Sequence, residues 1–199
     1  MKRLFLLVCT ALLGACSILP QSEPLDAYLL PAKPLPAHNA AVDWALRVSS
    51  PTSNPLLDST RILVLPTAER VNTYQGVRWS ERPAQLLQAR LLDAFHDDGR
   101  ISALSSDTPR LQADLELVSE LRAFHSQYQG GHPEALIQLD VRLVDTRDQR
   151  ILASRRFNVQ QPAHDTSVDA VVVAFGQAAD RLAQELVDWT LNQRLGSSP

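Results

Sequence analysis

Apolar and polar positions alternate over three long segments in the second half of the chain, and this period of two is typical of half-buried β-strands. Polar or glycine-containing turns separate the segments, so we expect an antiparallel three-strand meander. A shift in the alternation near Val118 predicts a β-bulge in the first strand. The predicted strands are residues 111–124, 135–144 and 151–159, with turns at 127–133 and 145–149.

Two segments show the spacing of amphipathic helices instead. The first is expected to begin at Pro83, because proline is tolerated in the first helical turn, and to end at Gly99. The second is expected to follow Ser167 as N-cap and to end at Gly196. Its apolar stripe covers about seven turns and predicts a core helix, although a seam between protomers is an alternative. The stripe consists of Val168, Val171, Val172, Phe175, Ala179, Leu182, Leu186 and Trp189.

The first half of the chain reads as short strands separated by prolines. Residues 61–65 form a continuous apolar run before Pro66, which fits a central strand buried on both faces. A hairpin is expected over residues 69–79, turning near Gly76. Further short strands are expected at residues 25–30, 42–48 and 101–104.

This order of elements predicts an α/β fold with a single domain over residues 25–196. We expect a mixed, largely antiparallel sheet that contains the three-strand meander, with two main helices packed on it. If both helices cover one face, the other face is open or faces another protomer. The sequence contains no internal repeat, low-complexity tract or second-domain boundary.

The first sixteen residues follow the pattern of a secretory signal. Lys2 and Arg3 precede an apolar run over residues 4–13, which is too short to cross the roughly 30 Å of a bilayer core. The run ends in Leu13-Gly14-Ala15-Cys16, which resembles a bacterial lipobox. In such signals a diacylglyceryl group is added to the cysteine thiol, the chain is cut before the cysteine, and the new amine is acylated. We therefore predict a cleaved signal peptide at residues 1–15, lipidation at Cys16 and a tether at residues 16–24.

Two alternatives to this lipid anchor remain. The segment could be an ordinary signal peptide with a cysteine at its exit, or Cys9 could be the modified residue, although only five apolar residues precede it. Two or more acyl chains give stable membrane attachment, so lipidated Cys16 would hold the domain at a membrane without spanning it. By resemblance to bacterial lipoproteins, Ser17 after the cysteine favours the periplasmic face of the outer membrane.

Charge and composition narrow the classes of partner. Removal of residues 1–15 takes away Lys2 and Arg3, so 17 basic and 22 acidic side chains remain and the net charge changes from −3 to −5. An acidic chain argues against nucleic acid as a partner, because such binding requires a basic surface. Cys9 and Cys16 are the only cysteines, so a lipidated mature domain would contain no disulfide.

The residues offer little catalytic or metal-binding chemistry. The chain has no phosphate-binding GxxxxGK[ST], no GxSxG and no HExxH motif. His125 and His132 flank the Gly130-Gly131 turn and could approach each other around a metal, but solvated turn histidines are the favoured interpretation. Likewise, Asp97-Asp98 is interpreted as a solvated helix end rather than a catalytic pair. We therefore expect no enzymatic activity, no metal and no cofactor apart from the covalent acyl chains on Cys16.

Tyr74, Arg78 and Trp79 are candidate contacts with a partner protein. Aromatic residues and arginine dominate the energetics of protein interfaces, and all three lie in the predicted hairpin. For Trp79, packing in the core under the first helix is the favoured interpretation.

Four segments resemble the ABC-type transport auxiliary lipoproteins (PqiC-like). They are the early Tyr28-Leu29-Leu30, the strand Arg61-Ile62-Leu63-Val64-Leu65-Pro66, the block Gly76-Val77-Arg78-Trp79-Ser80-Glu81-Arg82-Pro83, and Trp189-Thr190-Leu191 in the last helix. The resemblance covers roughly residues 25–193. One departure concerns residues 67–70, Thr-Ala-Glu-Arg, where typical members are more aromatic.

The resemblance implies a non-catalytic accessory subunit, anchored in the outer membrane and facing the periplasm. It would act with an MCE-domain protein and a permease or ABC component in lipid traffic between the two membranes, and a homo-oligomeric ring is compatible with this role. A structural lipoprotein that assists outer-membrane barrel or cell-wall assembly is the alternative. A lipoprotein hydrolase is disfavoured because no nucleophile–base pair is evident.

Overall fold

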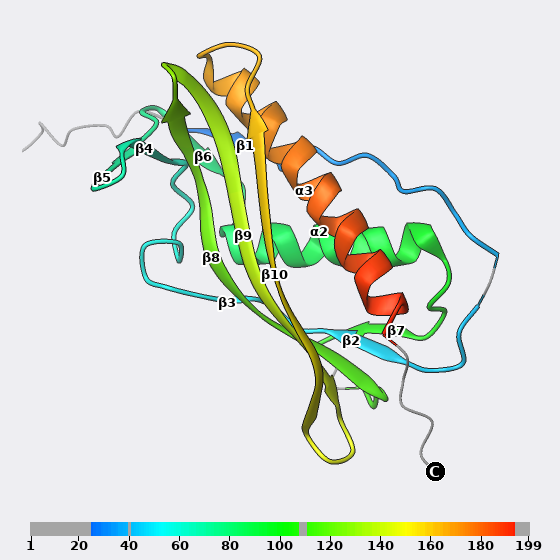
Figure 1. Cartoon of the computed structure of the whole chain (residues 1–199). Helices are drawn as coiled ribbons and strands as arrows, with labels where there is room; N and C mark the ends of the chain where they lie inside the picture. The colour runs from blue at the N-terminus through cyan, green and yellow to red at the C-terminus, as the bar shows by residue number, and fades with distance from the viewer. Residues whose placement is uncertain (1–24, 40, 108–110, 194–199) are drawn as a thin grey trace, which may run out of the picture.

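Three long antiparallel strands form the centre of the domain. The computed structural model describes residues 25–39, 41–107 and 111–193. Strands β8 (Leu115–Gln129), β9 (His132–Asp145) and β10 (Arg150–Pro162) pair in sequence as a meander, as predicted (Figure 1). Their inward side chains on β9 are among the most buried of the domain: Ala135, Ile137, Leu139, Val141 and Leu143.

The predicted bulge is present in β8 but lies closer to the hairpin. Leu121 pairs with Leu139 of β9 and Ala123 with Gln138, so Arg122 is the extra residue. The alternation continues past Val118 because Ser119 takes the next inward position and is almost fully buried. In the sequence, the polar Ser119 at an inward position therefore resembled a shift in the alternation of apolar and polar residues.

The β8–β9 turn contains only two residues. Gly130 and Gly131 have φ angles of 58° and 86°. Positive φ at both central positions is typical of a tight hairpin whose twist matches that of the strands, and glycine adopts it without steric strain. The strands therefore extend into the predicted turn, to Gln129 and from His132.

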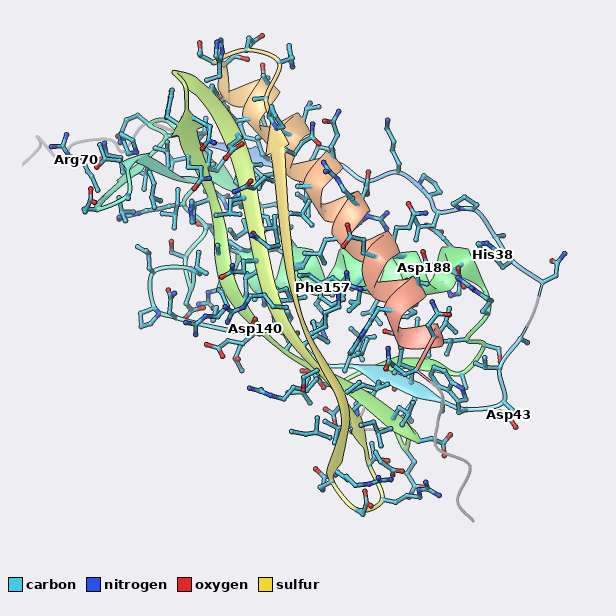
Figure 2. All side chains as sticks on the ribbon, viewed as in Figure 1. His38, Asp43, Arg70, Asp140, Phe157 and Asp188 are labelled. Atoms are coloured by element: carbon cyan, nitrogen blue, oxygen red, sulfur yellow. The ribbon has the colours of Figure 1, made fainter. Side chains whose placement is uncertain are left out.

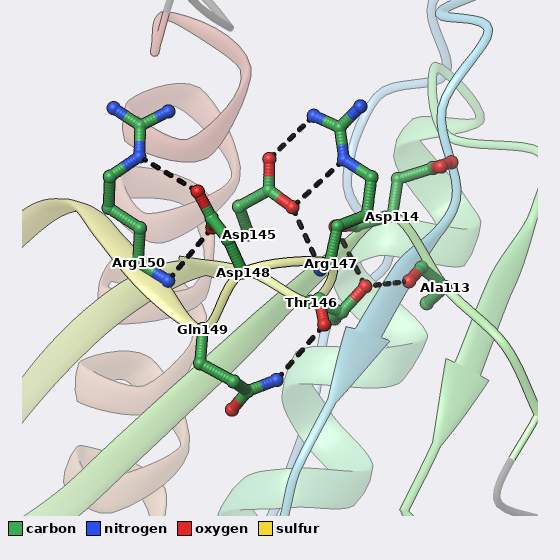
Figure 3. Close-up of polar contacts among 8 residues, drawn as sticks. All are labelled: Ala113, Asp114, Asp145, Thr146, Arg147, Asp148, Gln149 and Arg150. Atoms are coloured by element: carbon green, nitrogen blue, oxygen red, sulfur yellow. Dashed lines mark hydrogen bonds and ion pairs between the residues drawn. The ribbon is translucent and has the colours of Figure 1, made fainter.

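Side chains hold the β9–β10 turn (Figure 3). Arg147 donates to both carboxylate oxygens of Asp145, at 2.6 and 3.1 Å, and its backbone N–H donates to the same group. These hydrogen bonds lower the pKa of Asp145 to about 2. The Thr146 hydroxyl donates to the Ala113 carbonyl oxygen, which ties the turn to the segment before β8.

Short parallel strands complete the mixed sheet. β8 pairs in succession with β2, β3 and β4, so one long strand organises several pieces of the first half of the chain. β7 pairs with β2, and β5 pairs with β4 in the antiparallel direction. These strands are β2 (Leu46–Val48), β3 (Thr52–Ser53), β4 (Leu63–Thr67), β5 (Arg70–Thr73) and β7 (Leu104–Ser106).

The predicted hairpin over residues 69–79 is wrong. The chain reverses at Ala68 and Glu69, so β5 returns along β4 instead. The second half of the expected hairpin, β6 (Val77–Trp79), pairs in parallel with β1 (Asp26–Tyr28) in a separate two-stranded sheet. Gly76, with φ of 74°, directs the chain away from β5. The period-2 pattern identifies strands but does not specify their partners.

The other short strands are shifted from the predicted ranges. The run at residues 61–65 contributes β4 only from Leu63, and the strand continues through Pro66 to Thr67. Proline fits there because the β4–β5 pairing is irregular between Val64 and Thr67. Burial is limited to the start of β4, so the strand is not buried on both faces throughout. The strands predicted at residues 42–48 and 101–104 begin with an isolated parallel bridge between Val42 and Ile101.

Both helices cover the same face of the sheet, and the fold class is the predicted one (Figure 1). α2 (Pro83–Asp98) begins at the predicted proline, and Gly99 ends it in the left-handed conformation. α3 (Val168–Leu191) begins after Ser167, whose hydroxyl accepts from the Ala170 N–H at 3.2 Å. α3 ends at Leu191, and Gly196 lies outside the described residues. No helix among the described residues has the length and apolar character needed to cross a membrane.

An aromatic cluster joins β6, β8 and α3. Trp79 makes edge contacts with Phe124 and Phe175, with ring centroids 5.7 and 5.3 Å apart, and the two phenylalanines stack at 4.8 Å. The apolar stripe of α3 packs into this core: its buried side chains include Val171, Val172, Phe175, Ala179, Leu182 and Leu186. The stripe is therefore core, as predicted.

A proline-rich segment, residues 29–39, crosses both helices, and we call it the strap. Its centre is held by Arg90 of α2, which is 3% exposed. The Arg90 guanidinium donates at 2.7 Å to Asp180 of α3 and at 2.7 Å to the Lys33 carbonyl oxygen. One buried cation thus connects α2, α3 and the strap. Beside it, Pro31 lies so close to α3 that only glycine fits at position 176.

We predict that Gly176→Ala destabilises the protein although alanine favours helix formation. The new Cβ would lie 2.6 Å from the Pro31 carbonyl oxygen, so the strap would have to move. Overpacking outweighs the gain in helix propensity, and the free energy of unfolding should fall by about 1–2 kcal/mol. Urea denaturation followed by circular dichroism measures this change. The exposed neighbour Gln177→Ala is the control and should be nearly neutral; an equally stable or more stable Gly176→Ala variant would contradict the close strap contact.

Candidate docking surface

The three predicted contact residues do not form one exposed patch. Trp79 is 0% exposed and belongs to the aromatic cluster, which confirms the favoured core interpretation. Tyr74 is half-buried; its hydroxyl lies 3.0 Å from the Ser126 hydroxyl of β8, and burial raises its pKa. Arg78 is also half-buried and donates to the Trp79 carbonyl oxygen at 3.3 Å. Only parts of Tyr74 and Arg78 are therefore accessible to a partner.

A groove lies beside β5, and we call it the β5 groove. It has a volume of about 890 Å³ and lies between the β4–β5 hairpin and the loop that precedes β4. Leu56 from the loop and Val71 from β5 are 48% and 42% exposed. The lining residues are Pro55, Leu56, Ser59, Arg61, Leu63, Val71, Asn72, Thr73 and Gln75.

The loop wall of the β5 groove is held in place by local contacts. The Asn54 side-chain oxygen accepts from the backbone N–H groups of Leu56 and Leu57, at 3.0 and 3.1 Å. Leu57 is buried in the core, whereas its neighbour Leu56 points outward. Asp58 forms an ion pair with Arg82 at 3.2 Å, just before α2. The Asx turn at Asn54 and the buried side chain of Leu57 therefore fix the position of the exposed Leu56 at the groove.

The β5 groove carries positive charge that forms no ion pair among the described residues. Arg61 lines it, and Arg70 lies at the tip of the β4–β5 hairpin, at one end of the molecule in Figure 2. No carboxylate of the described residues lies within 4.0 Å of either guanidinium, while Arg82, Arg90 and Arg100 are all ion-paired. Sequence reasoning assigned Arg61 and Val71 to strands and missed the groove, because it depends on how β5 folds back onto β4.

The uncovered face of the meander is polar and internally paired. Arg122 contacts Glu120 at 2.5 Å, and Arg156 contacts both oxygens of Asp140 at 2.5 and 2.7 Å. The hydrogen bonds from Arg156, together with the charges of Arg122 and Arg142, hold the pKa of Asp140 below its usual value. These side chains leave the sheet face hydrophilic, so it needs no covering layer.

The two histidines of the predicted turn are not brought together. His125 pairs with Leu136 and His132 with Gln129, so the two lie four residue positions apart along the hairpin, about 13 Å at 3.3 Å per residue. Burial lowers the pKa of His125, whereas His132 is exposed at the turn. Within the described residues no three metal-ligating side chains cluster.

Asp97 and Asp98 are structural rather than solvated. Asp98 is 3% exposed and accepts from both Nε and Nη2 of Arg100 at 2.7 Å. His38 of the strap lies 3.0 Å from the same carboxylate, and Asp188 of α3 contacts Arg100 at 3.2 Å (Figure 2). Asp97 accepts from the Leu35 backbone N–H. The pair therefore fixes the strap to the end of α2, and the expectation of a solvated helix end is wrong.

Comparison with known proteins identifies the family. The model of the ABC-type transport auxiliary lipoprotein component matches residues 28–187. The chain belongs to this family. A crystal structure of a protein from Xanthomonas campestris is 35% identical, covers 84% of this chain and 94% of its own, and has a TM-score of 0.76. A Chlamydia trachomatis protein at 11% identity covers 75% of this chain and 97% of its own, with a TM-score of 0.51, and shares the fold alone.

A curated relative is longer than this chain. An uncharacterised protein of Bradyrhizobium diazoefficiens is 29% identical over 147 residues, which are 74% of this chain. The match covers 39% of that relative's length. Family membership agrees with the class of protein predicted from the sequence, the ABC-type transport auxiliary lipoproteins.

We predict that ionised Asp98 makes the stability of the fold depend on pH in the acidic range. Burial raises its pKa, but the hydrogen bonds and charge of Arg100, with the nearby His38, outweigh burial and keep it below 3.8. Because the pKa of Asp98 is lower in the folded protein than in the unfolded chain, the ionised carboxylate stabilises the fold at pH values above 3.8. This stabilisation is lost as the pH falls below 3.8 and through the pKa of the folded state. Asp98→Asn should therefore reduce the free energy of unfolding by roughly 2 kcal/mol at pH 7.

The difference between wild type and Asp98→Asn should shrink as the pH falls from 5 to 2. Denaturant titrations at several pH values measure it, and exposed Asp43→Asn provides the control because no ion pair involves Asp43 among the described residues. A difference that stays constant over this range would show that the Asp98 carboxylate does not stabilise the strap through its charge.

Proposed function

We propose that this protein is a lipid-anchored, non-catalytic accessory subunit of an MCE/ABC-type system that moves lipid between the inner and outer membranes. Cys16, which lies outside the described residues, would carry the acyl chains and hold the domain on the periplasmic face of the outer membrane. The domain would then dock the periplasmic part of the transporter, an MCE-domain protein together with its permease or ABC components. A homo-oligomeric ring remains part of this proposal.

The observation that carries the proposal is family membership combined with the lipobox-like Leu13-Gly14-Ala15-Cys16. The fold agrees with a positioning role, because three carboxylates with lowered pKa values are engaged in ion pairs that support structure: Asp98 with Arg100, Asp140 with Arg156, and Asp145 with Arg147. Their charges are satisfied within the domain, whereas the β5 groove leaves apolar and cationic side chains accessible.

We predict that Cys16→Ala releases the protein from the membrane. Without the acyl chains the attachment energy of about 0.8 kcal/mol per buried methylene is lost, and the variant should move to the soluble periplasmic fraction. Fractionation of envelopes, with mass spectrometry of the mature amino terminus, measures both location and modification. Cys9→Ala serves as the control and should fractionate like the wild type. An unmodified terminus on a membrane-bound wild type would reject the anchor.

Docking is tested separately by crosslinked purification of the lipidated protein from intact envelopes. The proposal expects co-purification of an MCE-domain protein and its permease. Recovery of barrel-assembly or cell-wall proteins in their place would support the alternative structural lipoprotein and overturn the transport role.

A further inference from the structure

We propose that the β5 groove binds an extended segment of a partner polypeptide, which adds as a strand to the free edge of β5 and places a carboxylate against Arg61. The inference rests on the proposed function, because the partner is expected to be a component of the transporter. It specifies the mode of docking: backbone pairing with an acidic, partly apolar segment.

The first support is the backbone of β5. This strand pairs with β4 on one side, and no described strand pairs with its other side. The Tyr74 N–H donates to the Ile62 carbonyl oxygen at 3.0 Å, so Tyr74 faces β4. Because hydrogen-bonded and non-bonded positions alternate along an antiparallel pair, the backbone groups of Thr73 face outward. The outward carbonyl of Thr73 accepts from the exposed side-chain amide of Gln75 at 3.2 Å, a contact that an added strand can replace.

The second support is the shape and chemistry of the walls. Val71 and Thr73 lie on one face of β5, and Leu56 faces them from the loop across the groove. An added strand directs alternate side chains to opposite faces, so every second residue would enter the groove and contact Leu56 and Val71. An apolar side chain at such a position would cover two of the large apolar side chains that the described domain leaves exposed.

The third support is charge. Arg61 in the β5 groove and Arg70 at its rim have no ion-pair partner among the described residues, whereas most other arginines do. An arginine fork matches a carboxylate geometrically, so an acidic side chain in the bound segment would complete the pairing. The same charges disfavour a basic segment.

The free edge of β10 is less suited to this role. β10 has an unpaired edge in the described structure but carries Arg155, which forms an ion pair with Glu185 of α3 and lies over the Phe157 ring. Charged side chains on an edge strand are a common protection against pairing with another chain. The β5 groove combines a free edge with exposed apolar side chains and unpaired cations.

Val71→Asp tests the groove against a matched control. Val173 on α3 is 43% exposed, almost the same as Val71, and lies outside the groove, so Val173→Asp introduces the same charge elsewhere. Partner recovery in crosslinked purification from envelopes should fall about tenfold for Val71→Asp, equivalent to ~1.4 kcal/mol, and stay near wild type for Val173→Asp. Circular dichroism and thermal melts verify that both variants fold. Equal recovery by the two variants would overturn the inference while leaving the proposed function intact.

A photocrosslinking amino acid at position 71, followed by mass spectrometry, identifies the occupant. The inference expects a peptide of the transporter that contains Asp or Glu, and reversal of that acidic residue to arginine should restore binding to Arg61→Glu. Crosslinks to a second copy of this chain or to its own residues 16–24 would overturn the inference. If wild-type protein recovers no transporter component, the proposed function fails first and the inference fails with it.

Discussion

The fold depends on the burial of one face of the three-strand meander beneath α3. Ile137, Leu139 and Val141 of β9 alternate inward along this face and are at most 2% exposed. Each fully buried aliphatic side chain contributes roughly 1.5–3 kcal/mol, so this layer is the main source of stability. Three short strands of the first half of the chain, β2, β3 and β4, are stable because each pairs with part of the long edge of β8.

The strap gives the domain a firm connection to the segment that precedes it. Its ties are spread over both helices: Arg90 holds its centre and Asp98 its end, while Tyr28 just before it donates to Asp169 at the start of α3 at 2.6 Å. These contacts fix residues 28–38 to both helices.

Ion pairing differs between regions of the described surface. On the outer sheet face and around the β9–β10 turn, several arginines are paired with carboxylates of the same domain, including Arg156 with Asp140 and Arg147 with Asp145. Such exposed ion pairs contribute little to stability, but their charges are already neutralised and do not require a charged group from another protein. The β5 groove differs because Arg61 and Val71 remain available. This contrast is the physical basis for placing docking there.

Local sequence determined the meander, both helices, the Ser167 and Gly99 ends and the family resemblance, because periodicity and capping act between residues close in the chain. Tertiary structure alone decided that β5 pairs with β4 and that β6 pairs with β1. The tertiary structure also shows that Asp98, which the sequence predicted to lie at a solvated helix end, is buried and connects the strap to the end of α2. These outcomes depend on contacts between residues far apart in sequence, whose partners a pattern of apolar and polar positions does not encode.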